Sequence, residues 1–240
     1  MGDIIYTTKT YSDILKFISA TFTIIFTDLD ETVLYPLTGF ISGVPQCDEQ
    51  LAVLERIYAG KFQRLMDELI EMYYDSETAL VEGHATRDTI AEAKSHSNAN
   101  IFGFTSRNLN DKYTSALFDD LDRLGVRFNE FGFEFEGFEH SRGIIFVNEQ
   151  PKGPKLVEFL GEKYVPYLIE QKIIDKELRV VFIDDSAKKC KSVFESLSKA
   201  SFEGVDEFKF QVVHYPKIID LITDKDMITS LAVATEKLIE

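Results

Sequence analysis

The sequence predicts an α/β fold with a doubly wound parallel sheet, helices on both faces and a small helical cap. Three runs of apolar or β-branched residues carry this prediction: 23–27, 101–105 and 178–183. Runs of this length and composition are typical of strands buried on both faces of a parallel sheet. Helical patterns separate the runs, and strands that alternate with helices form parallel sheets. The 240 residues are enough for one such domain.

The first part of the chain predicts a short helix over 11–20, followed by the first strand, which ends at about Asp28. The segment 34–41 is aromatic and punctuated by glycine, which favours a turn or flap. Asp48 is then expected to cap a long amphipathic helix, which Gly60 is placed to divide in two.

The middle of the chain predicts a helix capped by Thr86, the strand that ends at Thr105, and a helix from Asn110 that Gly125 closes. A change of period follows, and it predicts a β-hairpin before the next helix. The first strand of the hairpin is indicated by alternating phenylalanines, Phe131, Phe133 and Phe135, which are expected to pack on the sheet. The second strand is indicated by the apolar run 143–147.

The last part predicts helices over 153–171 and 186–199, a strand over 208–214 and a helix from Pro216. Asp226 is expected to cap a C-terminal helix over 226–240. That helical pattern stops in mid-period, which favours a natural chain that continues past Glu240. A helix that docks on the core and frays is the alternative.

The long separation of Asp28 and Thr105 predicts the cap. These residues lie 77 positions apart, whereas a βαβ unit needs only about 30 residues. The surplus over 34–80 is expected to form a small helical cap above the carboxyl edge of the sheet. The core is then expected to comprise 1–33 and 81–225, with the C-terminal helix as a separate element.

Carboxylates follow two of the predicted strands. Asp28 and Asp30 follow the first strand, and Asp184 and Asp185 follow the run that begins at Leu178. Open α/β sheets bind ligands at the carboxyl ends of their strands. Four carboxylates gathered there need a neutralising charge, and the usual one is a hard divalent cation such as Mg²⁺.

Two further features complete a recognisable order of motifs. A hydroxyl pair and a guanidinium follow the strand at 101–105, and Lys152 begins a helical pattern before the Asp184–Asp185 pair. With Asp28 and Asp30 first, this order resembles that of the haloacid dehalogenase-like hydrolase superfamily, over about residues 20–215. The first motif has a second aspartate, Asp30, and in this it resembles the phosphatases of that superfamily that have a small cap after the first motif. The presence of Asp30 argues against dehalogenation.

The resemblance implies an Mg²⁺-dependent phosphomonoester hydrolase. Asp28 would form an aspartyl-phosphate, Asp30 would act as general acid and then base, and Lys152 would balance charge. The resemblance implies substrate contacts from Thr105, Ser106, Arg107 and Lys152, and metal ligands among Asp28, the Leu29 carbonyl, Asp30, Asp184 and Asp185. Asp184 is the first choice for direct ligation, with Asp185 holding a metal-bound water or orienting Lys152.

Alternatives remain at each level. The aspartates and hydroxyls are also common helix caps, and Arg107 is equally suited to an internal ion pair. A small, open cap suits phosphoserine or phosphotyrosine on proteins, while metabolite or nucleotide monophosphates, and phosphotransfer to an alcohol, stay open. A non-catalytic binding module is the remaining alternative.

Composition narrows the partners and the compartment. The net charge of −15 argues against nucleic-acid binding. No apolar stretch approaches the ~20 residues that span a bilayer. A phosphorylated small molecule or protein is the expected partner, and contact with a membrane or a further partner is expected only through a region beyond residue 240, if the natural chain continues there. The start at 1–4 lacks the features of a signal peptide, and the chain has two cysteines. A cytoplasmic location is expected, with export by another route left open.

Overall fold

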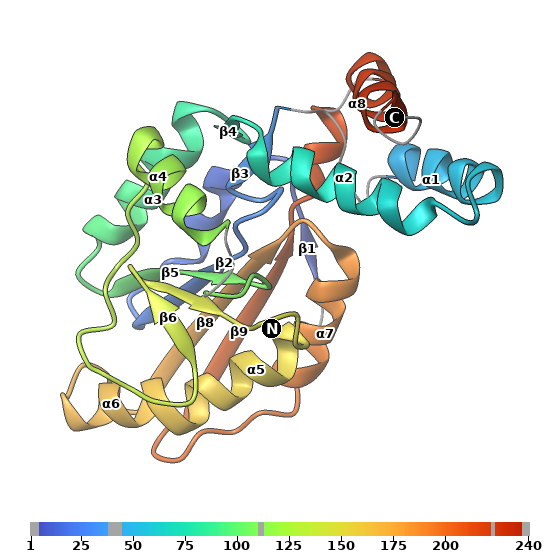
Figure 1. Cartoon of the computed structure of the whole chain (residues 1–240). Coiled ribbons are helices and arrows are strands. Elements are labelled where there is room, and N and C mark those ends of the chain that lie inside the picture. The colour runs from blue at the N-terminus through green and yellow to red at the C-terminus, as the bar shows by residue number, and fades with distance from the viewer. Residues whose placement is uncertain (1–4, 38–44, 110–112, 222–223, 237–240) are drawn as a thin grey trace.

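The computed structural model describes residues 5–37, 45–109, 113–221 and 224–236, and within them it contains a seven-stranded sheet (Figure 1). The strand order is β1-β9-β8-β2-β5-β7-β6, and neighbouring strands run parallel except β6 and β7. This arrangement confirms the predicted α/β class with a mostly parallel sheet. The strands are β1 Tyr6–Thr7, β2 Thr23–Thr27, β5 Ala99–Thr105, β6 Glu139–Ser141, β7 Ile144–Phe146, β8 Glu177–Asp184 and β9 Glu207–His214.

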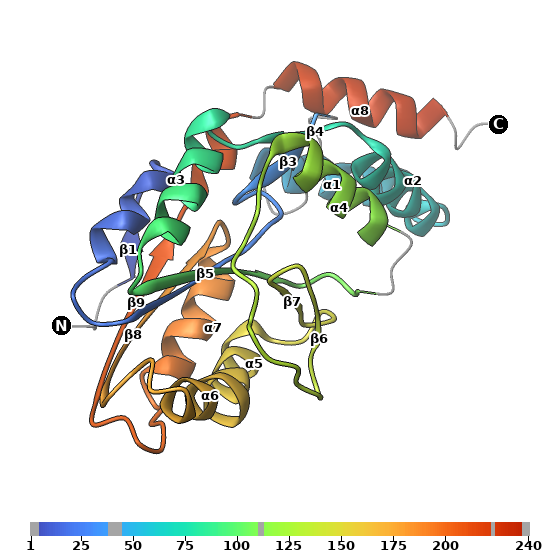
Figure 2. The same cartoon turned by 90° about the vertical axis from the view of Figure 1, so that its left-hand side faces the viewer.

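Helices cover both faces of the sheet (Figure 2). Successive residues of a strand point to opposite faces, so Ile24 and Phe26 pack on one face while Ile25 packs on the other. The first face is covered by α5 Lys152–Phe159, α6 Val165–Glu170 and α7 Ala187–Leu197, and the second by the 3₁₀ helix η1 Tyr11–Phe17, α3 His84–Ser95 and α4 Thr114–Leu124. The predicted helix over 153–171 is interrupted by a π-helical turn, η2 Leu160–Tyr164.

The cap contains helices from two distant parts of the chain. α1 Pro45–Ile57 and α2 Phe62–Asp75 lie in the predicted cap segment, and α8 Asp224–Glu236 packs beside α2 (Figure 1). Their shared apolar cluster is separate from the sheet core and includes Cys47, Leu65, Leu69, Ile218, Leu231 and Ala234. The C-terminal helix, expected to stand apart from the cap, therefore forms part of it.

The predicted secondary structure of two segments was wrong. The alternating Phe131, Phe133 and Phe135 form no strand, and the hairpin is β6 with β7 instead. Their rings pack on one another and on Phe159 and Tyr164, so the alternation reflects aromatic packing in an irregular segment. The expected flap also contains a strand, since β3 Leu34–Pro36 pairs antiparallel with β4 Thr78–Leu80 and forms the base of the cap.

Several predicted helix boundaries shift by a few residues. Helix α1 begins three residues before Asp48, α3 begins two residues before Thr86, and α8 begins two residues before Asp226. The chain between α1 and α2 includes Gly60, as predicted, and Gly125 closes α4 in the left-handed conformation that glycine favours. The helix from Pro216 is the short 3₁₀ helix η3 Pro216–Asp220, and Asn110 lies outside the described residues. None of the described helices is both long and apolar enough to cross a membrane.

A close contact between α5 and α7 depends on Gly153. A Cβ at this position would lie 2.3 Å from the carbonyl oxygen of Ser192 and 2.5 Å from Oγ of Ser196. We expect Gly153→Ala to force the two helices apart and to lower the free energy of unfolding by about 1–3 kcal/mol. Urea denaturation followed by circular dichroism measures this change.

The control is Gly60→Ala, because a Cβ on Gly60 meets no atom within 4 Å. That variant is expected to unfold at the same urea concentration as the wild type or slightly higher. Equal stability of the two variants would show that the α5–α7 contact tolerates a methyl group.

Candidate active site

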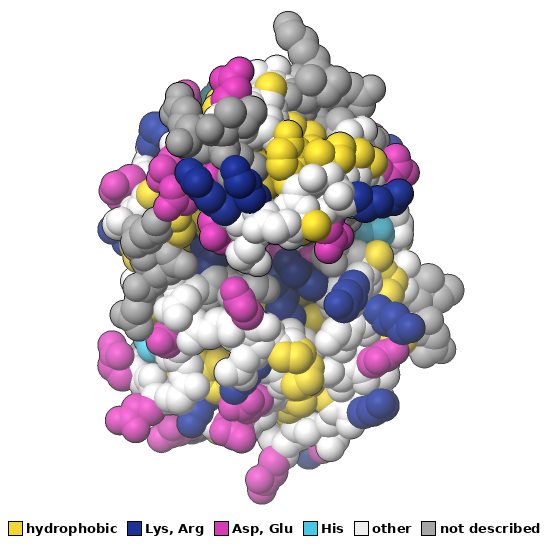
Figure 3. All heavy atoms as spheres, turned by 45° about the vertical axis from the view of Figure 1, so that its right-hand side comes forward, with side chains coloured by type: hydrophobic (Ala, Val, Ile, Leu, Met, Phe, Trp, Pro, Cys, Tyr) yellow, Lys and Arg dark blue, Asp and Glu magenta, His cyan; other side chains and the backbone are white. Residues whose placement is uncertain are grey.

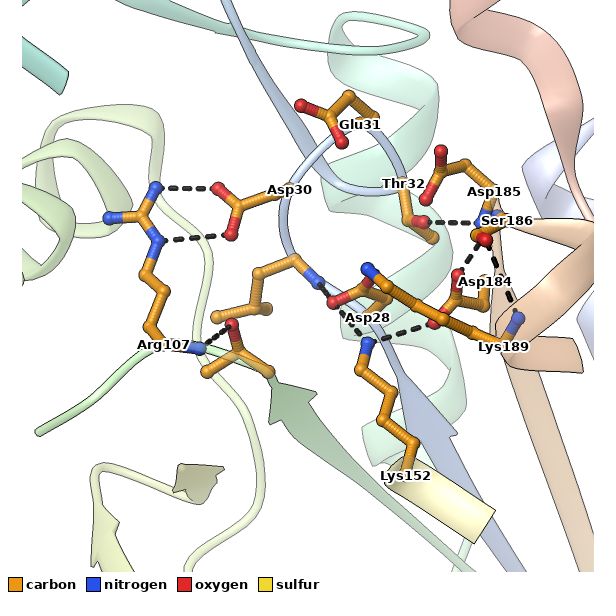
Figure 4. A network of polar contacts seen from close by, with 12 residues as sticks. Asp28, Asp30, Glu31, Thr32, Arg107, Lys152, Asp184, Asp185, Ser186 and Lys189 are labelled. Atoms are coloured by element: carbon orange, nitrogen blue, oxygen red, sulfur yellow. Dashed lines mark hydrogen bonds and ion pairs between the residues drawn. The ribbon is translucent and has the colours of Figure 1, made fainter. Parts of the chain in front are cut away.

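Three neighbouring strands deliver polar side chains to one edge of the sheet. β2 lies between β8 and β5, so their carboxyl ends lie side by side. Asp28 follows β2, Asp184 ends β8 and Thr105 ends β5. Lys152 is the first residue of α5 and reaches the same edge. The structure thus brings these four predicted residues to the carboxyl edge of the sheet (Figure 4).

Asp28 is the buried centre of the site, with 1% of its surface exposed. Its Oδ1 accepts hydrogen bonds from the Leu29 amide at 2.8 Å and from Lys152 Nζ at 2.6 Å. Lys152 also contacts Asp184 Oδ2 at 2.8 Å, so one buried ammonium joins the two strand-end carboxylates. The second oxygen, Asp28 Oδ2, faces Lys189 Nζ at 3.3 Å.

Asp28, Asp184 and Asp185 form a group suited to a hard cation. Each offers a carboxylate oxygen, and these atoms lie within 4.8 Å of one another. The Asp185 amide donates to Thr32 Oγ1 at 3.0 Å, which joins the loop after β2 to the loop after β8. Asp185 Oδ1 is buried and has no hydrogen-bond partner among the described residues. A buried oxygen in need of a partner beside two other carboxylates fits a divalent ion with oxygen ligands.

Neighbouring charges and burial shift the pKa of Asp28 in opposite directions. Burial raises its pKa, but the ammonium groups of Lys152 and Lys189 outweigh burial and lower the pKa to about 2. The charge of Asp28 in turn raises the pKa of Lys189. Asp28 is therefore an ionised carboxylate over the physiological range, as a nucleophile or metal ligand must be.

The other carboxyl groups at this edge of the sheet have too little positive charge near them to keep all of them ionised. Burial, followed by the charge of Asp28, raises the pKa of Asp184 to about 6, and burial with the charge of Asp184 raises that of Asp185 to about 9. Burial and the charge of Asp30 raise the pKa of Glu31 to about 8. Five carboxylates thus face Arg107, Lys152 and Lys189, so full ionisation leaves two negative charges without a counter-charge. One divalent cation would supply that charge.

Asp30 turns away from the acidic group toward Arg107 (Figure 4). The guanidinium donates from Nε to Oδ2 at 3.0 Å and from Nη2 to Oδ1 at 2.5 Å, a bidentate pair in which both side chains are mostly buried. Arg107 also lies over the ring of Tyr74 from α2, 4.8 Å from its centroid. Arg107 therefore fixes the Asp30 carboxylate and places it close to the cap helix α2.

Two of the predicted metal ligands do not join the acidic group. The Leu29 carbonyl accepts hydrogen bonds from the Val33 and Leu34 amides, both at 2.9 Å, so the turn itself satisfies this oxygen. These bonds argue against Leu29 as a ligand. Asp30 lies with Arg107, and Arg107 makes the internal ion pair that was the alternative to substrate binding.

The predicted hydroxyl pair lies at the end of β5. Thr105 is fully buried, and its Oγ1 accepts a hydrogen bond from the Arg107 amide at 3.2 Å. Ser106 is the next residue in the chain and is half-buried. Both residues lie at the edge of the sheet where a phosphoryl group was expected.

Sequence reasoning missed several residues of the site. Lys189 lies in the first turn of α7, whose N-cap is Ser186, and this helix starts directly after β8. The first turn of a helix that leaves the ligand-binding edge was the signal that could have identified it. Tyr73 of α2 donates to Glu31 Oε1 at 2.7 Å. Thr32 belongs to the motif after the first strand, but its role as acceptor for the Asp185 amide was not predicted.

Comparison with known proteins identifies the family of the chain. The model of a family described as "Protein of unknown function (DUF2608)" matches residues 7–238. Because the match covers nearly the whole sequence, the chain belongs to this family. No curated protein matches the chain.

Proposed function

We propose that this member of the DUF2608 family is an Mg²⁺-dependent phosphomonoester hydrolase that forms an aspartyl-phosphate on Asp28. The observation that carries the proposal is the arrangement around Asp28, a buried, ionised carboxylate with Lys152 on one oxygen and two further carboxylates beside it. Nucleophile, charge balance and cation ligands are the components that phosphoryl transfer requires. The resemblance of the motif order to haloacid dehalogenase-like phosphatases supports the same chemistry.

Asp28 Oδ2 is the oxygen suited to attack phosphorus, because Oδ1 already accepts two hydrogen bonds. The new Oδ2–P bond forms as the P–O bond to the leaving group breaks. For Asp30 to protonate the departing oxygen, it would first have to leave its ion pair with Arg107 and take up a proton from solvent. Water then attacks phosphorus, Asp30 takes up the proton, and the Oδ2–P bond breaks to release phosphate. Lys152 holds Asp28 in place throughout, and Thr105 lies at the edge that receives the phosphoryl oxygens.

Asp28, Asp184 and Asp185 would hold Mg²⁺, which when bound supplies positive charge to offset that of the phosphoryl group and the carboxylates. The surroundings favour an anionic substrate despite the net charge of −15. Figure 3 shows Lys and Arg side chains gathered around a hollow in the middle of one face. With a divalent cation bound, the excess charge of the carboxylates would be offset, and nearby lysine and arginine side chains would then favour the approach of an anion.

The cap side of the site is aromatic. A pocket there is lined by Asp30, Arg107 and four tyrosines, which are Tyr35, Tyr73, Tyr74 and Tyr113. Asp30 lines this narrow pocket, and we propose that the leaving group departs on this side of the site. Phosphotyrosine or phosphoserine on a protein suits this small cap, and a metabolite or nucleotide phosphate is the second candidate substrate. A reducing, cytoplasmic location is part of the proposal, since Cys47 and Cys190 are buried and are not joined in a disulfide.

Metal removal tests the proposal. We expect excess chelator to abolish hydrolysis of a generic aryl phosphate and added Mg²⁺ to restore it, because the five carboxylates at this edge exceed the three cations that face them by two charges. At 100 times its Kd, Mg²⁺ should also stabilise the fold by about 2.7 kcal/mol. Full activity in excess chelator would contradict the proposed metal site.

A non-catalytic binding module is the alternative, and the Asp30–Arg107 pair favours it. A general acid whose two oxygens both accept hydrogen bonds from a guanidinium is poorly placed to protonate a leaving group. The same aryl phosphate assay separates the two functions, since a binding module turns over no substrate. A panel of phosphopeptides, sugar phosphates and nucleotides, with alcohols as acceptors, then distinguishes the substrates and detects phosphotransfer.

A further inference from the structure

Lys152 and Lys189 both contact Asp28, but they are held very differently. Lys152 Nζ is buried and makes two short ion pairs, at 2.6 Å to Asp28 and 2.8 Å to Asp184. Lys189 Nζ makes one longer contact, 3.3 Å to Asp28 Oδ2, and 35% of its side chain is exposed. The first lysine is a fixed part of the core, whereas the second has a path to solvent and little to hold it in place.

Lys189 occupies the only oxygen of Asp28 with capacity for a new partner. Oδ1 accepts from both Lys152 and the Leu29 amide, so a metal ion or a phosphorus atom must approach Oδ2. The Lys189 ammonium lies at that oxygen and also experiences the charges of Asp184, Asp185 and Glu31. In Figure 4 its side chain extends from α7 across the acidic group.

We propose that Lys189 is a tethered, exchangeable cation that holds the cation position beside Asp28, Asp184 and Asp185 and is displaced toward solvent when a divalent ion binds. Two cations in contact with one carboxylate oxygen repel each other, so the ammonium and the metal exclude one another. The exchange keeps the carboxylates compensated when no metal is present. This inference rests on the metal site of the proposed function, and it makes Lys189 a positioning residue rather than a catalytic one.

Calorimetric titration of the full chain with Mg²⁺ at one fixed pH tests the exchange. We expect Lys189→Met to bind Mg²⁺ about tenfold more tightly than the wild type, because the competing ammonium is gone. Lys189→Arg keeps the charge and should bind more weakly than Lys189→Met. Lys188→Met removes the same charge from the neighbouring, exposed position and should match the wild type. Thermal melting of each variant shows that the fold is intact.

A second measurement follows the lysine itself. Acetylation of amines by an activated ester, read by mass spectrometry, should modify Lys189 faster in the presence of Mg²⁺, while the rate at Lys188 stays constant. Unchanged or weaker Mg²⁺ binding by Lys189→Met would overturn the exchange, and so would the absence of binding in every variant.

The outcomes separate this inference from the proposed function. Tighter metal binding by Lys189→Met without any phosphatase activity would support the exchange and contradict the hydrolase. Mg²⁺-dependent hydrolysis with equal affinities in the wild type and Lys189→Met would support the hydrolase and overturn the exchange.

Discussion

Replacing Asp28 with asparagine is expected to lower phosphatase turnover by about 10⁴-fold or more, because the amide cannot attack phosphorus. The fold should survive, since Lys152 keeps its ion pair with Asp184 and the asparagine oxygen still accepts from the Leu29 amide. Steady-state kinetics at saturating Mg²⁺ measures the loss. Affinity for Mg²⁺ should fall as well, because one of the three grouped carboxylates is neutralised.

Asp206→Asn is the matched control for the loss of one negative charge. Asp206 pairs with Lys176 in an exposed salt bridge and should keep wild-type activity. Beryllium fluoride adds a direct readout, since it mimics a phosphoryl group on an aspartate and should inhibit the wild type. A folded Asp28→Asn protein that hydrolyses aryl phosphate at a near-normal rate would end the covalent mechanism.

Asp30→Asn should separate metal binding from proton transfer. We expect kcat to fall by about 10²–10⁴-fold, the usual contribution of general acid–base catalysis, while Mg²⁺ affinity stays within a fewfold of wild type. Asp30 lies outside the acidic group, which is the structural reason for the unchanged affinity. Kinetics together with calorimetric Mg²⁺ titration gives both quantities.

The Asp30–Arg107 pair requires a second variant. Asp30→Asn leaves the mostly buried guanidinium without its charged partner, which should destabilise the fold by about 1–3 kcal/mol. Asp30→Asn combined with Arg107→Gln removes both charges and should recover much of that stability without recovering the rate. Recovery of turnover in the double variant would mean that Asp30 acts through Arg107 and not on the leaving group. Loss of Mg²⁺ binding with a normal rate at saturating metal would also contradict this role.

The parallel sheet was predictable because its strands are continuous apolar runs bounded by polar residues. The same reasoning placed Asp28, Thr105 and Asp184 at one edge, since strand ends in a parallel sheet lie together. It failed at Phe131, Phe133 and Phe135, where alternation arises from aromatic rings packed on the helical segment that follows β7 and not from strand pairing.

Side-chain partners at the site were harder to predict than backbone positions. The turn after β2 places Asp28 and Asp30 two residues apart, yet they face different cations: Lys152 and Lys189 contact Asp28, whereas Arg107 contacts Asp30. No periodicity in the sequence encodes that turn. The docking of α8 on α2 was equally hidden, since an amphipathic helix shows which side is apolar but not which surface covers it.

The participation of α8 in the cap has a consequence for the order of synthesis. Cys47 and Leu231 belong to one apolar cluster although they lie far apart in the chain. During translation, α1 and α2 therefore leave the ribosome long before the helix that covers them. The strands that carry Asp28 and Asp184 precede α8 in the chain, so the sheet can assemble while the cap still exposes Leu65 and Leu69. Nascent chains of this protein are thus expected to need protection at the cap until the last helix arrives.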